Sequence, residues 1–178
     1  MKIVQNTSNF SDKEKTYVTI GTFDGVHFGH QKIIEKLIDE AKKAGKKSVV
    51  LTFFPHPRMV LQKDVSLELI NTIEERATLL EKTGLDYLII HPFSKEFSRM
   101  TALEFVRDIL VNQLNISKLI IGYDHHFGKN REGNITQLTE YSHLYDFKVE
   151  EIPAQDIDDV SVSSTKIRRA LATGNLKT

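Results

Sequence analysis

The sequence predicts an α/β domain with a doubly wound parallel sheet. Short apolar runs alternate with longer segments of helical period, two of the helical segments open with a Thr-x-x-Glu capping pair, and a glycine-rich turn joins the first run to the first helix. Strands that are separated by helices cannot pair as hairpins. They lie parallel, joined by right-handed crossovers, with helices on both faces of the sheet.

Five strand-helix units follow from this pattern. The expected strands cover residues 17–21, 48–53, 87–90, 118–121 and 148–152, and the expected helices cover residues 30–44, 73–82, 101–113, 137–145 and 165–172. The first helix ends at Gly45, and the second and third begin at Thr72 and Thr101, which pair with Glu75 and Glu104 in capping boxes. We expect an irregular loop after the second strand, where prolines interrupt the pattern.

Length and composition favour one domain over residues 1–178, with 24 basic and 24 acidic side chains and no cysteine. The absence of cysteine excludes disulfides, thiolate zinc sites and a cysteine nucleophile, and it fits a cytoplasmic location. The balanced charge predicts no nucleic-acid partner. The polar N-terminus and the lack of a long apolar run predict neither a signal peptide nor a membrane partner. Small ligands are therefore the expected partners.

The turn from Gly21 to His30 is the first candidate site, because parallel sheets bind ligands at the carboxyl ends of their strands. Glycines let a ligand approach the backbone, and a helix start offers free N–H groups to an anion. His27 and His30, three positions apart, face the same way and add imidazole donors. These features predict a phosphate site, although a glycine turn with two incidental histidines, or a metal-binding pair, explains the same residues.

The segment 162–169 at the start of the last helix is the second candidate. Ser163, Ser164 and Thr165 are good capping residues, and basic residues on a helix usually face water. If both helix starts open at the same end of the sheet, however, Ser164, Thr165 and Arg168 face His27 and His30, and together they suit several phosphates.

Two further loops carry unusual residues. Residues 52–57, Thr-Phe-Phe-Pro-His-Pro, predict a stiff aromatic wall that either stacks on a flat heterocycle or belongs to the core. Residues 122–133 form a charged loop between glycines, of a kind that often binds ligands. Five of the seven histidines fall in the candidate loops, which leaves a histidine metal site open, but no carboxylate lies at a familiar ligand offset.

These motifs, taken in order, resemble a known family. The motifs are GTFDGVHFGH, TFFPHP, the helix around Arg76, LDYLII followed by PF, the loop 122–133 and SSTKIR. From about residue 18 to 176 the chain resembles the FMN adenylyltransferase (FAD synthetase) module of bacterial bifunctional riboflavin kinase/FAD synthetases. That module belongs to the H-x-G-H nucleotidylyltransferase superfamily, which implies a Rossmann-like nucleotidylyltransferase fold. The sequence departs from many relatives at His125-His126, where they carry Phe-Arg, and the riboflavin kinase domain usual in the family is absent from this chain.

The resemblance implies transfer of AMP from ATP to FMN, giving FAD and pyrophosphate, with Mg²⁺ arriving on ATP. It implies catalytic roles for His27, His30 and Arg168. Because magnesium at phosphate sites takes few protein ligands, we assign no metal ligand on the protein, and Asp124 is the one candidate. The implied ATP-binding residues are Gly21, Thr22, Phe23, Gly25, His27, Gly29, His30, Ser163, Ser164, Thr165 and Arg168. The implied flavin-binding residues are Phe54, Pro55, His56, Pro57, Asp124 and Phe127.

Three alternatives stay open on the residues alone. A related enzyme joining a nucleotide to another phosphorylated acceptor would carry the same phosphate motifs, and only the acceptor loops would differ. A non-catalytic module would bind flavin or nucleotide without forming FAD. A metal-dependent hydrolase would use the histidines as ligands.

Overall fold

The computed structural model describes residues 1–62, 67–123, 125–153 and 162–175. Its centre is a sheet of parallel strands in the order β1-β4-β3-β2-β5-β6, which confirms the predicted doubly wound α/β fold. The strands are β1 (Lys2–Gln5), β2 (Thr16–Ile20), β3 (Lys47–Phe54), β4 (Tyr87–Pro92), β5 (Ile116–Gly122) and β6 (Lys148–Ile152).

Six strands, rather than the five expected, make up this sheet. β1 is an edge strand in parallel register with β4, Ile3 lying opposite Leu88. It escapes sequence analysis because three of its four residues are exposed, so it shows no apolar run. Backbone hydrogen bonds to β4, more than side-chain burial, hold it in place.

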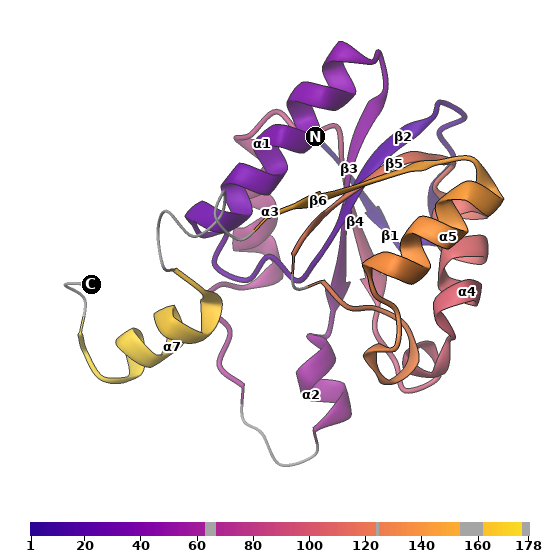
Figure 1. The fold of residues 1–178 in the computed structure, drawn as a ribbon. Helices are drawn as coiled ribbons and strands as arrows, with labels where there is room; N and C mark the ends of the chain where they lie inside the picture. Colours follow the sequence, from indigo (N-terminus) through magenta and orange to yellow (C-terminus); the bar gives the residue numbers. More distant parts are fainter. Residues whose placement is uncertain (63–66, 124, 154–161, 176–178) are drawn as a thin grey trace.

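Helices cover both faces of the sheet. They are α1 (Phe28–Lys43), α2 (Pro57–Leu61), α3 (Ile73–Glu81), α4 (Ala102–Glu104), η3 (Phe105–Gln113), α5 (Ile135–Tyr145) and α7 (Ser164–Ala172), and short 3₁₀ turns form at η1 (Thr7–Asn9), η2 (Phe97–Arg99) and η4 (Lys129–Arg131). α1 and α3 pack on one face, whereas η3 and α5 pack on the other (Figure 1). The two hydrophobic cores are therefore separated by the sheet itself.

Local sequence explains where these helices begin and end. Both predicted capping boxes form, Thr72 with Glu75 and Thr101 with Glu104. Gly45 follows the end of α1 with a φ of 63°, which glycine adopts at little cost. The predicted helix over 101–113 differs in form, because only its first turn is α-helical and η3 is a π-helix. The segment expected to be irregular after β3 contains α2, whose first residue is Pro57.

The order of the strands places a switch point at β2. β2 pairs with β3 on one side and with β5 on the other. The chain runs from β2 to β3 and β4 on one side and later crosses to β5 and β6 on the other side. The loops that follow β2 and β5 therefore open a crevice at the carboxyl end of the sheet, the usual place for a ligand in this architecture. None of the helices in the described ranges has the length and apolar character needed to cross a membrane.

Candidate functional site

The loop between β2 and α1 is tightly wound. Phe23, Gly25 and Val26 have positive φ values of 49°, 84° and 40°. A Cβ at Gly25 would lie 2.8 Å from Cδ1 of Ile70, so a side chain would meet both backbone strain and a clash there. The loop ends at His27, the N-cap residue of α1, whose side chain makes no capping hydrogen bond within the described part of the chain. N–H groups of the first turn of α1 thus remain available to a ligand.

The two predicted histidines come together at the start of α1. Their rings stack with centroids 3.6 Å apart and an interplanar angle of 21°, and the edge of Phe23 packs on His30 at 5.1 Å. Burial, followed by the proximity of His27 and Arg76, lowers the pKa of His30 to about 3. Burial also lowers the pKa of His27. At neutral pH the pair is uncharged, so it offers N–H donors rather than two positive charges.

Asp24 lies at the centre of the loop and is fully buried. Its carboxylate accepts hydrogen bonds from the backbone N–H groups of Ile70 (3.0 Å) and Asn71 (3.4 Å), from Arg76 (3.2 Å) and from Arg168 (2.5 Å). Burial alone would raise the pKa of Asp24, but the hydrogen bonds from Arg168 and the two backbone groups outweigh burial and lower it. The carboxylate is therefore ionised at neutral pH.

Arg76 supports the same loop from α3. Its side chain is 1% exposed, and it donates to the carbonyl oxygen of Thr22 at 2.7 Å as well as to Asp24. The Thr22 carbonyl also accepts a hydrogen bond from the Thr52 hydroxyl at 3.2 Å. The loop is consequently tied to both β3 and α3.

The start of α7 lies against this loop, which meets the condition set for the second candidate site, that both helix starts open at the same end of the sheet. Ser163 caps α7 by accepting from the Lys166 N–H, which bears out the capping role of this serine. The Ser164 hydroxyl donates to the carbonyl oxygen of Asp24 at 2.9 Å, while Thr165 is exposed. Arg168 reaches Asp24, three residues before His27, so segments more than 130 residues apart in sequence share one site.

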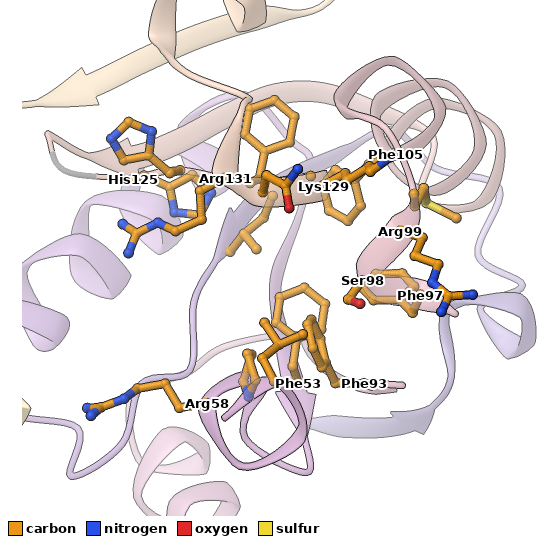
Figure 2. Close-up of a pocket in the computed structure, with 18 of the residues that line it drawn as sticks. Phe53, Arg58, Phe93, Phe97, Ser98, Arg99, Phe105, His125, Lys129 and Arg131 are labelled. Carbon is orange, nitrogen blue, oxygen red and sulfur yellow. The ribbon is translucent and has the colours of Figure 1, made fainter. Parts of the chain in front are cut away.

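An aromatic cavity of about 870 Å³ opens beside this loop. Rings of Phe53, Phe93, Phe97, Phe105 and Phe127 contact one another in a chain of pairs, with centroids 5.6 to 6.2 Å apart. Figure 2 shows labelled rings around the open space, with Arg58 and Arg131 on one side and Arg99 on another. Such dimensions and an apolar lining are typical of small-molecule sites.

Glycines shape the far wall of the cavity. Phe127 and Gly133 form an isolated antiparallel bridge, and a Cβ at Gly133 would lie 2.6 Å from the Phe127 ring. Gly128 has a φ of 74° and lies against the backbone of Ala102, where a Cβ would come within 2.9 Å of the nitrogen. The loop after β5 can therefore press Phe127 into the cavity only with glycine at both positions.

The expected flavin-binding residues divide between two places. Pro57 and Phe127 line the cavity, together with His125 and His126. Phe54, Pro55 and His56 do not line it, and Phe54, which is 41% exposed, borders a separate hollow that also contains Met59 and Ile70. Asp124 is outside the described residues.

The sequence analysis placed Phe53 in the aromatic wall of residues 52–57 but named Phe54 as the flavin-binding residue, whereas Phe53 is the one that lines the cavity. Successive residues of a strand point to opposite faces, and Phe53 shares the face of Val49 and Leu51, which pack in the same core. Sequence reasoning missed Phe93, Phe97 and Phe105, which come from three separate segments, and it gave no role to Asp24, Asn71 or Arg76. Only the fold brings these residues together.

His56 is buried and directly precedes Pro57, which lines the cavity. Its Nδ1 accepts the Arg58 backbone N–H at 3.1 Å and so caps α2, which leaves the proton of the neutral ring on Nε2. Burial, followed by the charge of Arg168, lowers the pKa of His56 to about 4.

A parallel sheet with this switch point and a histidine-bearing helix start defines a Rossmann-like nucleotidylyltransferase fold. The chain belongs to the FAD synthetase family, whose model matches residues 9–166.

Relatives of this chain include two bifunctional riboflavin kinase/FMN adenylyltransferases. The protein from Buchnera aphidicola subsp. Schizaphis graminum is 35% identical over 173 residues, covering 96% of this chain and 55% of that one, and the protein from Escherichia coli (strain K12) is 33% identical over 178 residues, covering 99% and 57%. The FAD synthetase of Listeria monocytogenes is 32% identical over 167 residues, covering 93% and 67%. The chain thus spans little more than half the length of the bifunctional relatives.

Two solved structures share the fold. A macrolide-efflux protein from Streptococcus pneumoniae matches with a TM-score of 0.86 at 28% identity, covering 98% of this chain and 57% of that one. A pantothenate synthetase from Thermus thermophilus matches with a TM-score of 0.56 at 15% identity, covering 96% and 71%. The second likeness concerns the fold alone.

Proposed function

We propose that this chain transfers AMP from ATP to FMN, giving FAD and pyrophosphate. The observation that carries the proposal is the adjacency of two sites at the carboxyl end of β2. Ile20, the last residue of β2, lines the aromatic cavity, and the next residue, Gly21, begins the loop that ends at His27. A flat ring system in the cavity would have its phosphate-bearing chain within reach of that loop.

In the proposed reaction an oxygen of the FMN phosphate attacks the α-phosphorus of ATP. A phosphorus–oxygen bond forms, the bond between the α-phosphorus and the bridging oxygen breaks, and pyrophosphate leaves with the electron pair. Because the nucleophile is already an anion, the step requires no general base and no covalent enzyme intermediate. The protein has to align the two phosphates and stabilise the charge that spreads onto the oxygens around phosphorus.

The chain offers three kinds of group for that task. The neutral imidazoles of His27 and His30 would donate to the phosphate oxygens, as would the free N–H groups at the start of α1. Arg168 would donate to the same phosphates from α7, and the Ser164 hydroxyl, which donates to the Asp24 carbonyl, would hold the start of that helix against the loop. These catalytic and ATP-binding assignments are part of the proposal.

A divalent cation, Mg²⁺ in our proposal, would reach the site on the phosphates of ATP. Within the described residues no three His, Cys, Asp or Glu side chains gather into a metal site, and the Asp24 carboxylate is already occupied by two guanidinium groups. These side chains do not form a resident metal site, and we assign no protein ligand and no step of the reaction to the cation.

The cavity would hold the isoalloxazine ring. Its aromatic lining suits a flat heterocycle better than a flexible aliphatic acceptor, and four cationic side chains, Arg58, Arg99, Lys129 and Arg131, suit a ligand that carries a phosphate. Phe53 replaces Phe54 in this part of the proposal because it lines the cavity. The proposal includes a cytoplasmic location and ATP and FMN as partners, without nucleic acid or membrane.

The experiment that tests the proposal mixes the chain with ATP, MgCl₂ and FMN and separates the flavins by chromatography. We expect FAD and one equivalent of pyrophosphate, neither of which forms without the protein. Pyrophosphate release with another phosphorylated acceptor, such as phosphopantetheine or glycerol phosphate, but not with FMN would assign a different acceptor. Binding of FMN without formation of FAD would show a non-catalytic module.

A further inference from the structure

Helix α7 carries residues of the site but is packed loosely on the rest of the protein. None of its described residues is buried, and it stands at the side of the sheet (Figure 1). Hydrophobic packing therefore contributes little to fixing its orientation. Polar contacts have to fix the direction in which Ser164 and Arg168 point.

Two of those contacts end on one residue, Asp24. The Ser164 hydroxyl donates to its main-chain carbonyl at 2.9 Å, and the Arg168 guanidinium donates to its carboxylate at 2.5 Å. Ser164 and Arg168 are four positions apart, so they lie one above the other on the same face of α7. One buried residue thus determines which face of the helix is turned toward the loop.

Asp24 is itself rigidly held. The N–H groups of Ile70 and Asn71 and the side chain of Arg76 all donate to its carboxylate. The side-chain oxygen of Asn71 also accepts the N–H of Gly25, the next residue in the loop, at 3.1 Å. Because the carboxylate is fixed by α3 and by the segment before it, it can orient a more exposed group. Arg168, whose side chain is 17% exposed, is that group.

Arg168 keeps capacity for a second anion. A guanidinium carries five N–H donors, and the contact with Asp24 occupies one nitrogen. Its Nε is buried without a hydrogen-bond partner among the described residues. Two guanidinium groups, of Arg76 and Arg168, face one carboxylate, so the cluster keeps one positive charge in excess.

We propose that Asp24 is a positioning residue for the nucleotide: its carbonyl oxygen holds Ser164 and thereby the start of α7, and its carboxylate fixes Arg168, so that α7 presents the remaining N–H donors of Arg168 to the phosphates of ATP. This inference rests on the proposed function for the identity of the ligand. Asp24 does not touch the nucleotide and acts through α7.

The test is a double-mutant cycle with Asp24→Asn and Arg168→Ala, in which kcat and the KM values for ATP and FMN are measured from FAD formation. Asn keeps the size of the side chain and removes its charge. We expect Asp24→Asn to raise the KM for ATP about tenfold and to leave the KM for FMN within about twofold, since only the nucleotide contacts pass through α7. In the double variant we expect values within about twofold of Arg168→Ala alone, because residues that act through one another are not additive.

Losses that multiply in the double variant would overturn the proposal, because Asp24 would then act independently of Arg168. A lower KM for ATP in Asp24→Asn would overturn it as well, since the carboxylate would be competing with phosphate for the guanidinium. Arg169→Ala is the matched control: Arg169 is the exposed neighbour of Arg168 on α7, and its loss should change none of these values by more than about twofold.

A second variant separates positioning from folding. Asp24→Asn leaves Arg76 buried without its charged partner, so this variant alone can fail to fold. In Asp24→Asn/Arg76→Met both buried charges are replaced, the fold no longer depends on their pairing, and Arg168 still lacks its carboxylate. We expect a folded protein by circular dichroism with the same tenfold rise in KM for ATP, and an unchanged KM would overturn the proposal.

Calorimetric titration with MgATP in the absence of FMN distinguishes this inference from the proposed function. If the chain binds ATP but forms no FAD, the proposed reaction is wrong, and the inference still predicts that Asp24→Asn and Arg168→Ala weaken ATP binding about tenfold each and no further together. If neither variant weakens ATP binding, or if the unmodified chain binds no ATP, the positioning role is wrong.

Discussion

The loop around Asp24 and the aromatic cavity lie side by side but are stabilised in opposite ways. The loop depends on buried charges and hydrogen bonds that share one carboxylate, whereas the cavity depends on contacts among phenylalanine rings from separate segments. A network with one centre fails as a unit, while a set of apolar contacts loses stability or affinity in steps. Substitutions should therefore have large, coupled effects in the first region and smaller, separable effects in the second.

The largest effect is expected from Asp24→Ala. It leaves the guanidinium of Arg76, which is 1% exposed, without a charged partner, and breaking a buried pair in this way typically costs about 3–5 kcal/mol of unfolding free energy. Urea unfolding followed by circular dichroism measures the change. Asp108→Ala is the control, because Asp108 forms an exposed pair with Arg107 that should contribute less than about 1 kcal/mol. Similar losses of unfolding free energy in both variants would mean that the buried Asp24 network stabilises the fold no more than an exposed ion pair does.

His30→Ala is expected to affect turnover more than folding. Removing one donor to the developing charge should lower kcat about 10²- to 10³-fold, which corresponds to about 2.7–4 kcal/mol of transition-state stabilisation. The free energy of unfolding should change much less, because His30 contributes one ring contact each to Phe23 and His27. Steady-state kinetics and urea unfolding on the same preparation check both halves. An unchanged kcat would remove His30 from the proposed mechanism.

The buried histidines predict a loss of stability at acid pH. In the folded protein the pKa is about 3 for His30 and about 4 for His56, below the ordinary value of 6.5, so below pH 6.5 the unfolded chain binds protons that the folded chain does not. The free energy of unfolding should be level above about pH 6.5 and fall as pH decreases, by about 2 kcal/mol for each of the two histidines at pH 5. Urea unfolding at a series of pH values measures it. Stability that rose between pH 6.5 and pH 5 would contradict these pKa directions.

Phe53→Ala tests the cavity against the loop. Loss of one ring from the lining should raise the KM for FMN about tenfold and leave the KM for ATP within about twofold, because the lost contacts are apolar and local. Phe54→Ala is the matched control, one residue further on and outside the lining, and it should leave both values within about twofold. If Phe54→Ala raised the KM for FMN and Phe53→Ala did not, the flavin would lie in the hollow beside Phe54 instead.

The pair Phe53 and Phe54 also shows what the sequence can predict. The stretch 48–53 identified the second strand and its place next to a site, but β3 is buried on both faces for most of its length, with Val49 and Leu51 in one core and Val50 in the other. An alternation of polar and apolar residues, which would have distinguished the faces, is therefore missing. The choice between two adjacent phenylalanines depends on the surrounding elements.

Capping boxes and the glycine turn were predictable because their causes are local. Thr72 and Glu75 cap α3 wherever that helix packs. The pairing of Asp24 with Arg76 and Arg168 has no local cause, since the partners are 52 and 144 positions away and an arginine on a helix usually faces water. β1 was missed for a related reason, because an exposed edge strand is held by its neighbour's backbone.

The smallest expected effect is at His56, which caps α2 beside the cavity. His56→Asn keeps an acceptor for the Arg58 N–H, and asparagine is a good N-cap, so α2 should persist and the free energy of unfolding at pH 7.5 should change by less than about 0.5 kcal/mol. His56→Ala loses the cap and should cost about 1 kcal/mol. The asparagine variant also lacks the titrating ring, so its stability should fall about 2 kcal/mol less between pH 6.5 and pH 5 than that of the unmodified protein. An identical pH profile in both proteins would place the acid sensitivity in other buried histidines, the stacked pair at the start of α1 and His91, and leave His56 as a capping residue alone.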